Sequence, residues 1–245
     1  MDFRKFASGF APLAAIGLAA MVSACHHADI SINGDAGKPL SELDMTGAPP
    51  HALVLLGPDK VQIHPGEKLA VTVDGDKDKA EKLRFTLQDG TIGILRRPGD
   101  WSGGDGLTVT VTMPPPRSLT MTGSGKITAA TLAPDAQISI AGSGDIVTPG
   151  VASEKLSVSI AGSGTYTADG KVGVLDISIA GSGNATMAGL KADKGSVSIV
   201  GSGDATFASD GAVNASMIGS GSVHVKGRAQ CTVSATGSGK LVCEP

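Results

Sequence analysis

The chain has 245 residues, and its 23 acidic and 20 basic side chains give a formal net charge of −3 at pH 7. This slight excess of acids argues against a nucleic-acid-binding protein, which concentrates positive charge in a patch. With 35 glycines, 3% aromatic and 41% hydrophobic residues, the sequence fits neither an ordinary globular domain nor a disordered low-complexity segment.

The first 25 residues have the pattern of a bacterial lipoprotein signal. Arg4 and Lys5 form a short basic region, and the apolar run that follows, residues 10–21, is shorter than the ~20 residues of a membrane span. The sequence "VSAC" at residues 22–25 resembles a lipobox, in which Cys25 becomes the lipidated first residue. The alternative is an ordinary signal peptide with an unrelated cysteine nearby.

The residue after Cys25 is a histidine rather than an aspartate, which resembles sorting to the outer membrane in a Gram-negative cell. We therefore expect a signal peptide at residues 1–24, a lipidated tether at 25–40 and one domain at 41–245. The lipid on Cys25 would hold that domain at the outer membrane or the periplasmic face of the envelope without a spanning helix.

Residues 41–118 repeat a weak pattern of leucine, any residue, an apolar residue and threonine. It begins at Leu43, Leu69, Leu83 and Leu107. We interpret these stretches as irregular rungs of the stack that the following residues predict. Between them, "KDKAEKLRF" near residue 80 is expected to be a turn or loop rather than a helix.

The segment "RRPGDWSGGDG" at residues 96–106 interrupts this pattern and is predicted to be a loop. It contains the only tryptophan of the chain. Trp101, with Arg96 and Arg97, is therefore the candidate contact for a small ligand, while a tryptophan packed against the domain is the alternative reading.

From residue 119 to the end, the chain repeats one unit. The tripeptide Gly-Ser-Gly begins at Gly123, Gly142, Gly162, Gly181, Gly201, Gly219 and Gly237, at steps of 19, 20, 19, 20, 18 and 16 residues. A period of this size is typical of a solenoid, in which each repeat stacks on its neighbours.

Within each unit, apolar and polar residues alternate before and after the tripeptide. The positions two and four residues before it are apolar, and the position between them is always a hydroxyl residue: Thr120, Ser139, Ser159, Ser178, Ser198, Ser216 and Ser234. This alternation predicts two short strands per rung, each with one buried face, joined at the Gly-Ser-Gly corner and followed by a looser return. Tyr166 falls on an inward position.

The middle serine of the corner never varies between the units: Ser124, Ser143, Ser163, Ser182, Ser202, Ser220 and Ser238. We expect a structural ladder of buried hydroxyl groups at this corner. A catalytic serine is the alternative, but no histidine or acid recurs beside these residues to activate it.

The stretch from residue 42 to 244 resembles the GIN-domain family, known as the putative auto-transporter adhesin head domain. The likeness rests on "SELDMTGAPPHALVLLGPDKVQIHPGEKLAVTVDG", "LRFTLQDGTIGI" and the junction "PPPRSLTMTGSG" at residues 114–125. The resemblance implies an all-β, right-handed β-helix-like solenoid on a secreted or lipid-anchored bacterial protein. The family has no established activity, so the resemblance supplies no catalytic residues.

A carbohydrate-active enzyme is the alternative function, because such enzymes also use β-helices. They need two carboxylates within roughly 5–10 Å. Asp145 and Asp204 share one outward column but lie three rungs apart, roughly 14 Å at the strand spacing. Neither a repeated aspartate nor a histidine motif indicates a metal, so no metal, cofactor or catalytic residue is predicted.

Cys231 and Cys243 both occupy inward positions of the last repeat. In an oxidising compartment we expect them to form a disulfide that clamps the open end of the solenoid. The function expected from the sequence is a non-enzymatic, lipid-anchored envelope protein for adhesion or envelope structure. Its partner would be an envelope protein or a glycan. A ligand- or metal-binding module at residues 96–106 is a third hypothesis.

Overall fold

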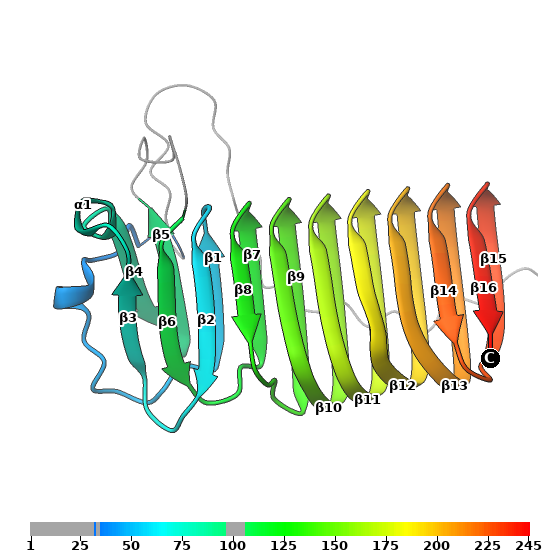
Figure 1. Ribbon diagram of the computed structural model, residues 1–245, viewed down its shortest axis with the longest axis horizontal. Helices are drawn as coiled ribbons and strands as arrows, with labels where there is room; N and C mark the ends of the chain where they lie inside the picture. The colour runs from blue at the N-terminus through cyan, green and yellow to red at the C-terminus, as the bar shows by residue number, and fades with distance from the viewer. Residues whose placement is uncertain (1–31, 33–34, 97–105) are drawn as a thin grey trace, which may run out of the picture.

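The computed structural model describes residue 32, residues 35–96 and residues 106–245. Figure 1 shows an elongated β-solenoid, with strands stacked side by side from β3 and β4 at one end to β15 and β16 at the other. The β-solenoid predicted from the repeat is confirmed. Its elements are η1 (Leu40–Glu42), β1 (Ala52–Leu56), β2 (Lys60–Pro65), β3 (Ala70–Asp74), α1 (Lys77–Ala80), β4 (Leu83–Gln88), β5 (Thr91–Arg96), β6 (Thr108–Met113), β7 (Ser118–Gly123), β8 (Lys126–Ala129), β9 (Asp135–Gly142), β10 (Asp145–Gly162), β11 (Thr165–Gly181), β12 (Asn184–Gly201), β13 (Asp204–Gly219), β14 (Ser222–Lys226), β15 (Gln230–Gly237) and β16 (Lys240–Glu244).

Equivalent residues of successive repeats lie in parallel register. Ile140 pairs with Ile160, which pairs with Ile179, and the first corner glycines pair in the same way. The strands before the corner form one face of the solenoid, in the order β5, β1, β7, β9, β10, β11, β12, β13 and β15. The strands after the corner form the opposite face, which begins with β6, β2 and β8 and ends with β14 and β16.

The core lies between these two faces. Both inward columns before the corner are 0–5% exposed from Leu119 to Met217. The inward columns after the corner are buried as well, from Ile127 to Val225. The predicted alternation of inward and outward positions is therefore confirmed, because stacking removes each apolar side chain from water above and below.

The returns between rungs are more regular than the sequence predicts. β10, β11, β12 and β13 run for 16–18 residues, from one corner through the return to the next corner. Register shifts within these long strands, such as the one between Thr148 and Val151, absorb the differences in repeat length. The returns stay extended because their backbone groups pair with the returns of the neighbouring rungs.

The N-terminal part is only partly a set of rungs. β1 and β2 form a complete rung that the weak leucine pattern does not mark, and β5 and β6 form the outermost one. The patterns at Leu69 and Leu83 lead into β3 and β4, which pair antiparallel with β6 and β5, and Leu43 lies outside the strands. The prediction of four irregular rungs is wrong for these three stretches. β3 and β4 instead pair with the two strands of the outermost rung, so their backbone groups satisfy edges that a further parallel rung would otherwise have to cover.

Two further details concern the segments near these strands. "KDKA" forms α1, a single helical turn capped by Asp76, whose carboxylate accepts a hydrogen bond from the Lys79 amide at 3.1 Å. Lys38, at the end of the predicted tether, forms a β-bridge with Phe85 in β4. The last residues of that tether therefore pack on the N-terminal end of the solenoid.

Candidate functional site

The face that precedes the corner presents three outward columns of small polar and apolar side chains. Its central column is the predicted hydroxyl column, which runs from Thr120 to Ser234 and is exposed or partly exposed throughout. In these columns between residues 118 and 236, Asp176 is the single charged residue, and its carboxylate lies 3.5 Å from the Lys155 ammonium. The result is a long and nearly neutral surface lined by hydroxyl groups.

Larger apolar side chains appear at the C-terminal part of this face. Val200 and Ile218 pair in register and are 52% and 57% exposed, where earlier rungs carry alanine at Ala161 and Ala180. The face therefore becomes more apolar toward β15. The sequence shows these residues, but their alignment on one surface depends on the register.

The corner serines do not form the buried hydroxyl ladder that the sequence suggests. All seven side chains are exposed, and the described residues show one hydroxyl pair among them, from Ser238 Oγ to Ser220 Oγ at 3.0 Å. The ladder runs through the backbone instead: the amide of Ser163 donates to the Gly142 carbonyl at 2.9 Å, and the amides of Ser143, Ser182, Ser202 and Ser220 make the same bond to the preceding corner. The prediction of buried hydroxyls is therefore wrong.

The third residue of the corner explains why it repeats. From Gly125 to Gly221 the third glycine of each corner is buried, and a Cβ atom on Gly203 would lie 2.3 Å from the Gly183 carbonyl oxygen. The first glycine has a positive φ, +128° at Gly201, which other residues rarely adopt. The glycines thus fix the corner, while the serine lies on its outer side.

Of the two outward aspartates after the corner, Asp204 has a structural partner. Asp145 and Asp204 lie in one column with two rungs between them, as expected. The Asp204 carboxylate accepts a hydrogen bond from the Ser222 amide at 2.8 Å, so it supports the next corner. Among residue 32 and residues 35–96 and 106–245, no group of three or more His, Cys, Asp or Glu side chains is arranged to hold a metal ion.

The Arg96 side chain is buried at the end of β5 rather than exposed in a loop. Its guanidinium forms a buried ion pair with Asp59, in which Nε donates to Oδ2 at 2.7 Å and Nη2 contacts Oδ1, and the residue is 5% exposed. Asp59 also accepts a hydrogen bond from the Leu107 amide at 2.8 Å. One buried carboxylate therefore holds the chain on both sides of residues 97–105. Trp101 and Arg97 fall outside the described residues.

Sequence reasoning missed Asp59, although a signal for it exists. In register, Gly57 aligns with Gly123 and Lys60 with Lys126, so Asp59 occupies the place of the buried third glycine of a corner. The stretch "GPD" is thus a corner in which the glycine is replaced by a carboxylate. Burial of a lone charge there would be costly, and the guanidinium offsets that cost.

Tyr166 lies in the core, as predicted, with a partner that the sequence analysis did not identify. Its hydroxyl lies 2.6 Å from Thr148 Oγ1, and both residues are fully buried in adjacent rungs. Burial raises the pKa of Tyr166 above its ordinary value, so the phenol stays protonated. Thr148 is the polar residue in an otherwise apolar inward column, and that exception was the available signal.

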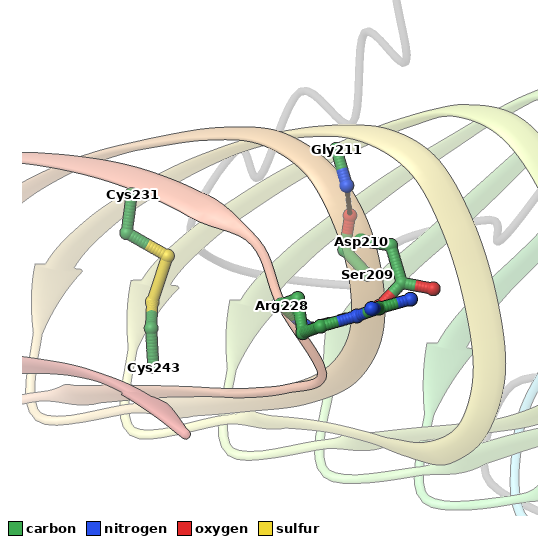
Figure 2. Close-up of a disulfide and its surroundings, with 6 residues drawn as sticks. All are labelled: Ser209, Asp210, Gly211, Arg228, Cys231 and Cys243. Atoms are coloured by element: carbon green, nitrogen blue, oxygen red, sulfur yellow. Dashed lines mark hydrogen bonds between the residues drawn. A yellow bond between two sulfur atoms is a disulfide. The ribbon is translucent and has the colours of Figure 1, made fainter. Parts of the chain in front are cut away.

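The terminal rung contains the predicted disulfide between Cys231 and Cys243, which is confirmed (Figure 2). It joins β15 to β16 across the interior of the last rung. Nearby, the Asp210 carboxylate accepts hydrogen bonds from Lys191 Nζ at 2.6 Å and from the Arg228 amide at 3.0 Å. The bond from Lys191, followed by that from Arg228, lowers the pKa of Asp210 below its ordinary value.

Shallow depressions on the described surface include one at each of two places. One is lined by Pro65, Gly66, Glu67, Pro114 and Pro115, and the other lies over the returns near Lys171 and Lys191. Neither contains a pair of facing carboxylates in the described residues.

No helix in the described ranges is long and apolar enough to cross a membrane. Cys25 lies outside these ranges.

The fold resembles several solved bacterial proteins. A putative adhesin from Bacteroides fragilis superposes with a TM-score of 0.73 at 18% sequence identity, over 80% of this chain and 93% of that one. A putative lipid binding protein from Parabacteroides distasonis gives a TM-score of 0.64 at 20% identity, over 81% and 93%. A putative adhesin from Parabacteroides merdae gives 0.63 at 18% identity, over 82% and 94%. These likenesses concern the fold.

A comparison with curated proteins finds no match. The sequence model of one family, "Putative auto-transporter adhesin, head GIN domain", matches residues 49–229, which is most of the solenoid. This match agrees with the resemblance carried by the 114–125 junction and the Gly-Ser-Gly rungs. The chain therefore belongs to the GIN-domain family of adhesin-like β-solenoid proteins.

Proposed function

We propose that this protein is a lipid-anchored, non-enzymatic adhesion module of the bacterial envelope, tethered through Cys25. The observation that carries the adhesion role is the nearly neutral, hydroxyl-lined face from Thr120 to Ser234. A rigid surface of this kind offers many hydroxyl donors and acceptors at the regular strand spacing of about 4.8 Å. It suits a repetitive partner such as a glycan or the surface of an envelope protein.

The geometry of the N-terminal end supports the anchor. Lys38 forms a β-bridge with β4 at the N-terminal end of the solenoid. Cys25 lies 13 residues before this anchored position in the sequence. Thirteen residues span at most about 45 Å when fully extended. The lipid would therefore hold the N-terminal end near the membrane and leave the faces of the solenoid accessible.

The anchor is tested by metabolic labelling of cells with a radioactive fatty acid, followed by membrane fractionation. We expect label on the wild-type chain in the outer-membrane fraction and none on a Cys25→Ser variant. Retention of label in Cys25→Ser, or an unlabelled wild-type chain, would overturn the proposal of lipidation. A Cys243→Ser variant serves as the control for loss of a cysteine elsewhere.

The adhesion face is tested by binding of the purified full chain, in detergent, to a panel of immobilised bacterial and host polysaccharides. Ser178→Glu places a charge in the middle of the face, and Thr186→Glu places the same charge on the opposite face, also at an exposed position. We expect binding that Ser178→Glu weakens and Thr186→Glu leaves unchanged. Equal effects of the two substitutions, or turnover of a polysaccharide, would contradict the proposal.

A further inference from the structure

The two ends of the solenoid are finished in different ways. At the N-terminal end, β3 and β4 pair antiparallel with the outermost rung and cover its edges. At the C-terminal end, β15 pairs with β13 and β16 pairs with β14 (Figure 1). In the described part of the chain, no strand pairs with the other edge of β15 or β16.

This free end exposes a cross-section of the core. Val233 is 50% exposed, although the six equivalent residues of earlier rungs, from Leu119 to Ala215, are 0–5% exposed. Ala235 is exposed, and Leu241 is only partly buried against the core. An apolar surface framed by two strand edges is a ready site for further strand pairing.

The end is also held in shape. The disulfide fixes β15 to β16, and Asp210 holds the turn at Arg228 that leads into β15 (Figure 2). β15, with the sequence "QCTVSATG", contains neither a charge nor a proline, the two devices that commonly protect an edge strand from pairing. Because this edge is already rigid, little conformational entropy is lost when it pairs with another strand.

We propose that the C-terminal end binds a second copy of the same chain, end to end, around a two-fold axis. In this arrangement β15 pairs antiparallel with β15 of the second copy, and β16 with its β16. An axis through Val242 places Lys240 opposite Glu244 of the second copy, and Glu244 opposite its Lys240. The contact therefore contains two symmetric pairs of opposite charge, which β-sheet pairing favours.

The same axis suits β15. The disulfide aligns Cys243 with Cys231, so Val242, which is one residue nearer the corner, lies level with Thr232. Thr232 then lies opposite Thr232 of the second copy, and Cys231 opposite its Val233. Cys231 and Val233 are inward positions, so the apolar core would continue from one copy into the other without like charges meeting.

The contact closes on itself, because each copy has one free end and one covered end. It therefore predicts a dimer rather than a filament. Ten strands lie along one face from β4 to β15, so the free end is about 43 Å from the covered end at the strand spacing. If Cys25 is lipidated, as the proposed function states, such a dimer joins two facing membranes.

The test is sedimentation velocity of the full chain, purified in detergent, over a range of concentrations. We expect a monomer–dimer equilibrium. Lys240→Glu and Glu244→Lys should each raise the dimer dissociation constant about tenfold or more, because both symmetric contacts change from attraction to repulsion. The double variant should recover most of the affinity. Lys126→Glu, at the equivalent position of an internal rung, is the control.

Val233→Lys should abolish the dimer, because it places a charge in the apolar contact. A thermal melt of each variant checks that the fold is retained. A monomer at all concentrations overturns the proposal, including the case in which another segment of the same chain covers the end. Assemblies larger than a dimer, or a dimer that the double variant does not rescue, overturn it as well. A dimer that fails to cluster vesicles carrying the lipidated chain contradicts the joining of two facing membranes and leaves the dimer itself standing.

Discussion

The corner glycine Gly203 provides the sharpest test of why the repeat exists. Replacement by alanine adds a Cβ atom 2.3 Å from the Gly183 carbonyl oxygen and 2.7 Å from Ile179 Cγ2. The carbonyl is a backbone group at the corner of the preceding rung, so a change of side-chain rotamer cannot relieve the clash. The adjacent Ser202→Ala substitution removes only an exposed hydroxyl and is the matched control.

Overpacking of this kind costs about 1–3 kcal/mol, and a backbone obstacle places Gly203→Ala near the upper end. The lower entropy of the unfolded chain offsets about 0.4–1 kcal/mol. We therefore expect a net loss of about 2 kcal/mol, which corresponds to a melting temperature about 4–8 °C lower for a chain of this size. Ser202→Ala should change the stability by less than about 0.5 kcal/mol.

Thermal unfolding followed by circular dichroism measures both variants. Hydrogen exchange at the corner amides adds a local readout, because the clash should loosen Gly203 and its neighbours before the rest of the solenoid. A Gly203→Ala variant as stable as the wild type would refute the steric account of the corner. A large loss in Ser202→Ala would instead restore the hydroxyl ladder that the sequence suggests.

Three further predictions concern the terminal disulfide and two buried polar pairs. Removal of the disulfide by Cys231→Ser with Cys243→Ser should destabilise the terminal rung by about 3 kcal/mol, visible as faster hydrogen exchange in β15 and β16 but not in β10. Tyr166→Phe should cost about 1–3 kcal/mol in denaturant unfolding because it leaves the Thr148 hydroxyl unsatisfied, and adding Thr148→Val should recover part of that loss; an equal or larger loss in the double variant would contradict this account. Asp59→Asn leaves a buried guanidinium without its counter-charge and should cost about 3–5 kcal/mol, so an unchanged melting temperature would argue against the ion pair.

The regular half of the solenoid could be predicted from the sequence because its information is local and repeated. Period-two alternation fixes which side chains point inward, and the recurring Gly-Ser-Gly corner fixes the register, since a slip by one residue would turn every apolar side chain outward. Tyr166 and the two terminal cysteines were placed inward on this basis alone. The disulfide followed, because both cysteines belong to one rung.

The failures of prediction have a common physical origin. Invariance of the corner serine suggested burial, but sequence alone does not show on which side of a bend a side chain lies, and here the glycines face the previous rung. Leu69 and Leu83 follow the pattern of the rungs, yet they lead into antiparallel strands, since alternation does not encode strand direction. Arg96 was expected in a loop that contacts a ligand, and its partner Asp59 lies 37 residues away.

The sequence by itself determined the solenoid, the inward and outward columns, the terminal disulfide and the family to which the chain belongs. Each of these depends on spacing within one repeat or between neighbouring repeats. The tertiary structure alone decided the capped N-terminal end, the buried pair of Asp59 and Arg96, and the exposed core at Val233. These features depend on which distant segments meet at the ends of the stack, where the periodicity that fixes all other contacts no longer applies.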